Sequence, residues 1–276
     1  MPDIEARPGR GALPATLCFS TLGCGELDLE DVLTLAVRRA IPAVELRTLG
    51  GRNELPQYFE ARYGTPERLR NSLAGFGVRI VSLDSSCQAI GSTRSDWSEL
   101  VALTPWALAV GARGIRVFDG GERGDSAELA SVRPMLEWWR GRGLLLELLI
   151  ETHDALARPA ALQAFIERYP GASILWDTHH TWTEGAEDPA TTWARVRGRA
   201  GHLHVKDSVA QQGYVPPGEG AFPFGDLIAA LRRDAFAGVI SLEWERHWFP
   251  ELPPIDAALD GLERVFSRHL TKRTTS

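Results

Sequence analysis

Four residues that can bind a metal ion stand at or near the ends of apolar runs in the second half of this chain. They are Glu151 after LLI, Asp177 after SILW, His204 within HLHV, and Glu243 after VISL. The intervals between them are 26, 27 and 39 residues, each long enough for a strand, a helix and the return. Because the C-terminal ends of parallel strands in β/α units lie on one side of a sheet, these side chains are expected to meet there.

Three carboxylates and one imidazole form a ligand set for a divalent cation. Such a set suits Mn²⁺, Co²⁺, Zn²⁺ or Mg²⁺, and Mn²⁺ is our first expectation. Asp177 follows an apolar run, so it is expected to be buried and to need a partner. Taken alone, a glutamate at a strand end is more often a surface residue, and a single histidine is more often a hydrogen-bonded core residue.

One ligand position has two candidates. Glu245 lies one strand period beyond Glu243, so both side chains would point to the same face. We choose Glu243 because it directly ends the apolar run, and Glu245 stays open as the alternative.

The elements that would position these residues alternate along the whole chain. Eight short apolar strands are expected, ending near Leu22, Arg47, Asp84, Phe118, Glu151, Asp177, His204 and Glu243. Eight strand–helix units in about 250 residues are typical of a single closed (β/α)₈ TIM barrel of the α/β class. An open doubly wound sheet is the structural alternative, but the first turn, STLGCGELD, lacks the third glycine of a dinucleotide-binding loop.

The segments between the strands carry helical periodicity and helix-start signals. Asp28 is the expected N-cap of a helix over 28–40, and Thr65 before Pro66 predicts a second helix that stops at Gly77. A last helix is expected from Pro254. Pro105 lies inside a further helical stretch and should kink or split it.

The predicted strand that ends at Glu151 contains a second glutamate that would also face the barrel interior. In LLLELLIE, period 2 places Glu147 on the same face as Glu151 and deeper in the barrel. Either this strand begins later, or Glu147 is paired inside.

Composition limits the class of protein. The 276 residues are 44% hydrophobic and 24% charged, with a net charge of −6 and a pI near 5.7. These values are ordinary for a globular protein and argue against nucleic-acid and anionic-membrane partners. Three cysteines without a CxxC pair, an N-terminus unlike a signal peptide, and no apolar run of ~20 residues favour a cytoplasmic protein.

The domain organisation expected from this pattern is simple. One barrel domain should extend over 1–276, with a flexible segment at 1–14 and a disordered tail at 271–276. A homodimer is compatible with the pattern, which does not determine the oligomeric state.

The chain resembles the sugar isomerase/epimerase superfamily with the xylose isomerase-like TIM barrel. The segments that carry this resemblance are LLIETHD, LWDTHH, HLHVKDS, VPPGEGAFPFGDLIAAL and GVISLEWE, within a similarity that extends from about Leu17 to Leu270. The resemblance implies that the family's Glu–Asp–His–Glu metal site falls on the four residues named above. It also implies that His180, the histidine of the Asp-x-x-His pattern, contacts substrate.

The resemblance implies proton-transfer chemistry on a sugar, polyol or keto-sugar derivative. A bound divalent ion would stabilise an enediolate, while Glu151 and Glu243 remove and return a proton. We expect further substrate contacts from residues that follow the strand ends, namely His153, Lys206, Asp207 and Arg246. Residues of lower rank, equally compatible with salt bridges at the barrel rim, are Glu45, Arg47, Asp84 and Arg116.

Three functional hypotheses follow. The first is a metal-dependent isomerase or epimerase. The arginine that ketose 3-epimerases carry soon after the ligand histidine is absent from SVAQQG, and the Lys-Asp pair is closer to isomerase and dehydratase members. The second hypothesis is therefore a lyase or dehydratase at the same site, and the third is a barrel that binds sugar without catalysis.

Overall fold

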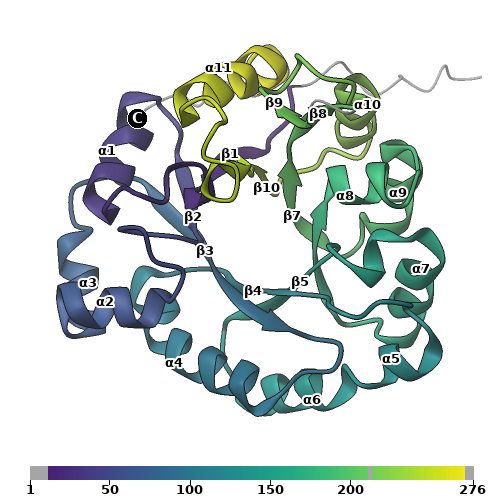
Figure 1. Ribbon diagram of the computed structural model, residues 1–276, viewed down its shortest axis with the longest axis horizontal. Coiled ribbons are helices and arrows are strands. Elements are labelled where there is room, and N and C mark those ends of the chain that lie inside the picture. Colours follow the sequence, from purple (N-terminus) through teal and green to yellow (C-terminus); the bar gives the residue numbers. More distant parts are fainter. Residues whose placement is uncertain (1–11, 211–212, 271–276) are drawn as a thin grey trace, which may run out of the picture.

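The computed structural model describes residues 12–210 and 213–270, and its centre is a closed barrel of eight parallel strands (Figure 1). Around the barrel the strands follow the order β1-β10-β7-β6-β5-β4-β3-β2. Their bounds are β1 Thr16–Ser20, β2 Ala43–Leu46, β3 Arg79–Gln88, β4 Gly114–Phe118, β5 Glu147–Glu151, β6 Ser173–Asp177, β7 Ala200–Val205 and β10 Val239–Leu242. The predicted (β/α)₈ TIM barrel is confirmed, and the open sheet is excluded.

Helices surround the barrel on its outer side (Figure 1). The α-helices are α1 Leu29–Arg38, α2 Leu55–Tyr63, α3 Pro66–Ser72, α4 Arg94–Val110, α5 Ser126–Ala130, α6 Arg133–Gly141, α7 Pro159–Arg168, α8 Thr178–Thr183, α9 Pro189–Val196, α10 Phe224–Arg233 and α11 Ile255–Phe266. Three 3₁₀ turns are η1 Thr21–Cys24, η2 Ala155–Ala157 and η3 Glu245–His247. A two-stranded antiparallel hairpin, β8 Asp207–Val209 and β9 Gly213–Val215, follows β7. Within the described residues, no helix has the length and apolar character needed to cross a bilayer.

The apolar core lies mainly between the strands and the outer helices. Trp176 of β6 and Trp193 of α9, for example, are both buried and stack with ring centroids 6.0 Å apart. Inside the barrel, a small separate apolar cluster is formed by Cys18, Ala43, Val81 and Val239. Toward the C-terminal ends of the strands, buried polar side chains such as Glu45, Arg116 and His204 lie among the strands of the barrel.

Most predicted element boundaries agree with the structure, and the differences have local causes. Asp28 precedes α1 as predicted, but its carboxylate does not cap the helix. It accepts a hydrogen bond from Tyr58 Oη at 3.0 Å and pairs with Arg62 at 2.9 Å, both on α2, a helix that the sequence analysis missed. Thr65 caps α3 as predicted, but that helix ends at Ser72, well before Gly77.

Of the two predicted effects of Pro105, a kink or a split, the split is wrong, because α4 is continuous over 17 residues. A proline removes one backbone hydrogen bond, and two other features hold this helix together. Thr93 and Asp96 form a reciprocal capping box at its start, and Leu103 and Trp106 beside the proline are buried in the core.

Glu147 is the first residue of β5, so the strand does not begin later. Its carboxylate pairs with Arg113 at 2.7 Å, and its side chain is 35% exposed. Glu147 is therefore paired at the N-terminal end of the barrel and lies at its edge.

The terminal segments that the sequence analysis expected to be flexible are described only in part. Residues 1–11 and 271–276 lie outside the described residues. Leu13, inside the segment expected to be flexible, is 1% exposed and forms a parallel β-bridge with Leu270. The ordered barrel therefore begins before residue 14.

Candidate functional site

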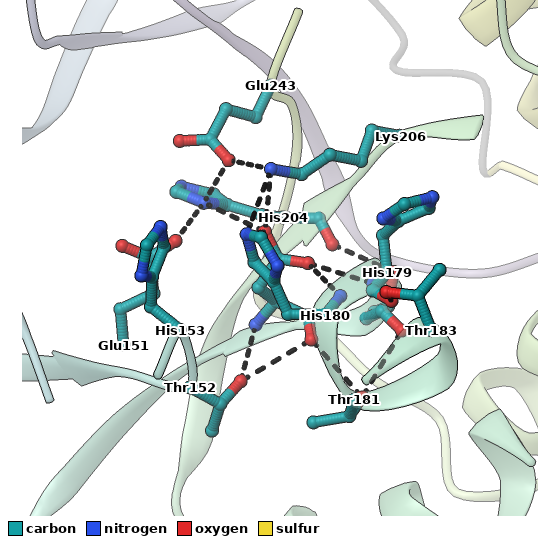
Figure 2. A network of polar contacts seen from close by, with 12 residues as sticks. Glu151, Thr152, His153, His179, His180, Thr181, Thr183, His204, Lys206 and Glu243 are labelled. Carbon is teal, nitrogen blue, oxygen red and sulfur yellow. Dashed lines mark hydrogen bonds and ion pairs between the residues drawn. The ribbon is translucent and has the colours of Figure 1, made fainter. Parts of the chain in front are cut away.

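The four predicted metal ligands converge at the C-terminal end of the barrel. Figure 2 shows three of them, Glu151, His204 and Glu243, close together. His204 Nδ1 lies 3.0 Å from Glu151 Oε1, 3.3 Å from Glu243 Oε2 and 3.9 Å from Asp177 Oδ2. One ligand atom of each residue lies within 4.8 Å of the others, and all four residues are buried. The four side chains that the strand spacing predicted to lie together are therefore close to one another in the structure.

Strand register explains how they meet. Asp177 of β6 pairs directly with His204 of β7, and the backbone N–H of Glu243 donates to the carbonyl of Val205 at 3.1 Å. Asp177 also ends its strand and begins α8. Its Oδ1 accepts hydrogen bonds from the backbone N–H groups of His179 and His180, which leaves Oδ2 free to face the cluster.

The choice between Glu243 and Glu245 follows from their different contacts. Glu243 joins the four-residue cluster through His204. Glu245 lies on η3, and its Oε1 contacts Lys206 Nζ at 2.6 Å. The chain turns out of strand conformation after Leu242, so the period-2 relation between the two glutamates no longer applies.

Lys206 supplies a buried positive charge beside the cluster. Its Nζ lies 2.5 Å from Glu243 Oε2 and 3.0 Å from Asp177 Oδ2, and the residue is 1% exposed. Burial alone would lower the pKa of Lys206, but Asp177, Glu243 and Glu245 raise it well above its usual value. The lysine is therefore charged at neutral pH.

A second cation lies on the other side of the cluster. Arg116 of β4 is 1% exposed, and its Nε lies 3.3 Å from Glu151 Oε2. Burial raises the pKa of Glu151, but Arg116 and His204 together outweigh this effect, and the pKa is lower than usual. Asp84 is 4.0 Å from Arg116, and burial together with the nearby Glu45 raises its pKa to about 7.

The donor set fits a divalent metal ion. Three carboxylates and one imidazole are suitable ligands, and their atoms are close enough to share one ion. Asp177 Oδ2 and Glu151 Oε2 are buried oxygens that receive no hydrogen bond from residues 12–210 or 213–270. Each of these oxygens lies within ion-pair distance of Lys206 or Arg116, and a bound divalent cation would be a further partner for both.

Two predicted substrate residues line the space next to this cluster. The rings of His153 and His180 lie 4.6 Å apart in an edge-to-face arrangement (Figure 2). His180 Nε2 is 3.6 Å from Asp177 Oδ2 and 3.5 Å from Lys206 Nζ. His153 is partly exposed and pairs with Asp154 at 3.0 Å. Both imidazoles could therefore reach a molecule bound beside the cluster.

Asp207 occupies a different position from the one a substrate contact requires. It is fully buried, and its carboxylate accepts hydrogen bonds from four backbone N–H groups at 2.8–2.9 Å. These donors belong to Ser208, Gly218, Gly220 and Phe222. A Cβ on Gly220 would lie 2.2 Å from Asp207 Oδ1, so the loop needs glycine there. Asp207 thus anchors the loop that follows the β8–β9 hairpin.

Arg246 points toward a different acid. It lies on η3, and its Nη1 pairs with Glu26 Oε1 at 2.9 Å. This pair connects the segment after β10 to the segment after η1. Within the part of the chain that the structure describes, Arg246 makes no hydrogen bond or ion pair with the four-residue cluster.

Three residues that the sequence analysis ranked low or left without a role, Glu45, Arg116 and His202, belong to the interior of the site. Glu45 contacts both His202 and His204, and Arg116 contacts Glu151. Glu45 and Arg116 carried a usable signal, because each is a charged residue within an apolar run. His202 lies two positions before His204 on β7, so strand periodicity places both side chains on one face.

Aromatic residues form one side of the site. Tyr214 of β9 lies 5.8 Å from Lys206 Nζ, and its ring is 5.6 Å from those of His179 and Phe249. His179 Nε2 is 2.8 Å from Ser208 Oγ, which connects α8 to the hairpin. Burial lowers the pKa of His179 to about 4, so its imidazole is neutral at physiological pH.

A second group of side chains that could bind a metal ion has a structural explanation in backbone hydrogen bonds. Asp119, His153 and Asp154 lie close enough to suggest ligands. However, Asp119 accepts hydrogen bonds from the backbone N–H groups of His153, Asp154 and Leu156. The carboxylate of Asp119 thus holds the loop after β5 in place.

Comparisons with solved structures agree with this architecture. The probable 3-DHS dehydratase AsbF from Bacillus anthracis is 19% identical, with a TM-score of 0.73 over 90% of this chain and 98% of that one. The IOLI protein with a bound zinc atom is 14% identical, with a TM-score of 0.73 over 93% of this chain and 99% of that one. The 3-keto-D-glucoside 4-epimerase YcjR from E. coli is 16% identical, with a TM-score of 0.67 over 92% and 99%. At these identities the similarity shows a shared fold.

The sequence itself identifies the family. No curated protein matches this chain in a sequence comparison. The family described as xylose isomerase-like TIM barrel matches residues 33–268, which is most of the chain. Together with the closed eight-stranded barrel, this match shows that the chain belongs to the xylose isomerase-like TIM barrel family.

Proposed function

We propose that this protein is a divalent-metal-dependent isomerase or epimerase that acts on a sugar, polyol or keto-sugar derivative. The observation that carries the proposal is the buried group of Glu151, Asp177, His204 and Glu243, with ligand atoms within 4.8 Å of one another. Its family consists mostly of enzymes, and the similar YcjR is named as a keto-sugar epimerase.

The four residues would hold one divalent ion, with Mn²⁺ as first choice and Co²⁺, Zn²⁺ or Mg²⁺ as alternatives. When bound, such an ion supplies Lewis acidity, which lowers the cost of negative charge on neighbouring substrate oxygens. The similar IOLI protein is described with zinc, which supports a site for a divalent metal in this fold.

Proton transfer would be the task of the two glutamates. Glu151 and Glu243 approach His204 Nδ1 from different strands, at 3.0 and 3.3 Å. One carboxylate would remove the proton from the carbon next to the substrate carbonyl, and the other would return a proton. The cations Arg116 and Lys206 keep these carboxylates ionised at neutral pH, since they help to lower the pKa values of Glu151 and Glu243 respectively.

The other polar residues would bind and orient the substrate. His153 and His180 would hydrogen-bond to its hydroxyl groups, and Lys206 would contact an oxygen near the reacting carbon. The aromatic side formed by Tyr214 and Phe249 would cover the apolar face of a sugar ring. Asp207 and Arg246, which have other partners, would act through the loops that they hold.

A dehydratase is the second candidate, and Lys206 is the observation that favours it. Eliminating a β-hydroxyl group requires an acid that protonates the leaving oxygen. The buried ammonium of Lys206 lies 2.5 Å from Glu243, so an acid and a base stand side by side. The similar AsbF is named as a probable dehydratase.

The test separates the two reactions. The purified protein, loaded with Mn²⁺, is incubated in D₂O with a keto-sugar such as a 3-keto-glucoside and with simple ketoses. Epimerisation predicts deuterium on one carbon of recovered sugar and a new stereoisomer by NMR. Dehydration predicts loss of water by mass spectrometry and absorbance from a conjugated enone.

The variant Glu151→Gln tests whether the proposed reaction takes place at this site. It removes both a metal ligand and a proposed base, so turnover should fall at least about 10²-fold. Glu147→Gln is the matched control, because Glu147 lies on the same strand but pairs with Arg113 at the opposite end of the barrel. Unchanged turnover in Glu151→Gln, or protein that binds sugars without exchange, would contradict catalysis at this site.

A further inference from the structure

Arg47 is a buried arginine that directly follows β2 at the C-terminal end of the barrel, and it is 4% exposed. Its backbone N–H donates to Thr21 Oγ1 at 2.8 Å, and its Nη2 donates to Ser86 Oγ at 3.0 Å. Within residues 12–210 and 213–270, its buried Nη1 has no hydrogen-bond partner. The backbone and one nitrogen of Arg47 are thus held in place, and a second nitrogen is left without an acceptor.

The sequence allowed a salt bridge at the barrel rim for Arg47, and among the described residues this salt bridge is not formed. Three acids act on its charge from beyond ion-pair distance, namely Asp84, Glu99 and Glu243. Asp84 instead faces Arg116 at 4.0 Å, and Glu243 lies 2.5 Å from Lys206 Nζ. Because Glu243 is a proposed metal ligand, these electrostatic effects place Arg47 in the polar region around the metal cluster.

Arg47 differs in this respect from the two other buried cations of the site. Arg116 Nε lies 3.3 Å from Glu151 Oε2, and Lys206 contacts three carboxylates. Taking a charge out of water costs free energy unless an opposite charge compensates it. Burial and the nearby Arg116 lower the pKa of Arg47 to about 10, so the guanidinium is charged at neutral pH. An anionic group on a ligand would compensate this charge.

We propose that Arg47 binds a carboxylate of the substrate, so that the substrate is a sugar acid. A carboxylate carries one negative charge and can accept two parallel N–H groups from one guanidinium. A phosphate ester carries about 1.5–2 negative charges and three acceptor oxygens, more than one unpaired arginine compensates. This inference rests on the proposed function, because it places the reaction at the neighbouring metal cluster.

The first measurement uses the unaltered protein and ligands that differ at one group. D-glucuronate carries a carboxylate where D-glucose carries a CH₂OH group, and D-gluconate and D-glucitol form a second such pair. Titration calorimetry in the presence of Mn²⁺ gives the Kd of each ligand. We expect the acid of each pair to bind about 10–100-fold more tightly, the range for hydrogen bonds to a charged group. Acids that bind no better than their neutral partners, or not at all, overturn the proposal.

The second measurement uses Arg47→Met, which removes the charge and keeps most of the side-chain length. We expect the acids to lose their advantage, while the affinities for D-glucose and D-glucitol stay unchanged. Arg79→Met is the matched control, because Arg79 begins β3 at the opposite end of the barrel and donates to Thr16 Oγ1 at 3.1 Å. If Arg47→Met still prefers the acids, the carboxylate binds another group, such as the metal ion, and the proposal is overturned.

Two further ligand and variant measurements complete the test. Arg47→Lys keeps the charge without the planar pair of donors, so it should recover only part of the preference for acids. D-glucose 6-phosphate that binds more tightly than D-glucuronate would assign a phosphate to Arg47 and overturn the carboxylate.

Failure of this inference and failure of the proposed function are distinguishable. Absence of metal binding or of proton exchange overturns the proposed function, whereas the comparison of acids with neutral ligands decides the role of Arg47. Because the comparison in the unaltered protein needs no substitution, poor folding of Arg47→Met would not prevent a decision.

Discussion

At the scale of single residues, the site is a balance between buried acids and buried cations. The chain has only two lysines, Lys206 and Lys272, although Lys and Arg together number 30. A lysine inside the barrel therefore departs from the chain's general use of arginine. Lysine is a compact point charge with three donors, which matches three separate carboxylates better than a planar guanidinium does.

This balance predicts the effect of removing Lys206. Lys206→Met leaves Asp177, Glu243 and Glu245 without their shared cation. We expect the free energy of unfolding of the metal-free protein to fall by about 3–5 kcal/mol, measured by urea denaturation. Added Mn²⁺ should reduce this loss, because the ion would neutralise two of the same carboxylates.

Two controls accompany this measurement. Arg264→Met removes an exposed pair with Glu219 and should change stability by no more than about 0.5 kcal/mol. Lys206→Arg keeps the charge but enlarges the side chain, and it should not restore full stability. Equal stability of Lys206→Met and the unaltered protein would mean that the acids are compensated by other groups.

At the scale of elements, loops supply the walls of the site, and the ends of the strands supply its proposed metal ligands. The β8–β9 hairpin brings Tyr214 next to Lys206, and the loop after it is held by Asp207. This arrangement explains why HVKDS is followed by a glycine-rich segment, since Gly220 leaves no room for a side chain beside Asp207.

The loop anchor makes a prediction of its own. Asp207→Ala removes the acceptor for four backbone N–H groups, so we expect a loss of stability of about 3 kcal/mol. Hydrogen exchange should become faster over 213–222, while Zn²⁺ affinity changes less than in Glu151→Gln. If Asp207→Ala weakens substrate binding without faster exchange in this loop, then Asp207 contacts substrate directly, as the sequence first suggested.

At the scale of the whole molecule, metal binding should be coupled to folding. The four proposed ligands come from β5, β6, β7 and the residue after β10, so the site exists only when these strands are assembled. A ligand that binds only the folded state stabilises it by an amount set by its concentration relative to Kd.

This coupling predicts a shift in thermal stability. Mn²⁺ at 100 times its Kd should stabilise the protein by about 2.7 kcal/mol. For a chain of this size we expect a rise in Tm of about 5–10 °C, reversed by a chelator. Asp177→Asn should abolish most of the rise, and an unchanged rise in that variant would place the ion elsewhere.

The sequence by itself determined the barrel and the four central residues, for a physical reason. Strand–helix alternation is a local property, and parallel β/α units necessarily bring their strand ends together. Glu151, Asp177, His204 and Glu243 could therefore be predicted to meet before any distance was known. The start of α3 could also be predicted from the sequence, because Thr65 and Pro66 form a recognisable helix N-terminus.

Only the tertiary structure decided which groups surround these four. Whether a charged residue within a strand is a rim salt bridge or an interior partner depends on strand register and barrel closure, and sequence periodicity contains neither. Thus Glu45, ranked low, contacts His204, while Asp207, ranked as a substrate residue, holds a loop. The sequence already favoured Glu243 over Glu245, and the structure adds the reason that Glu245 lies beyond the end of β10, on η3.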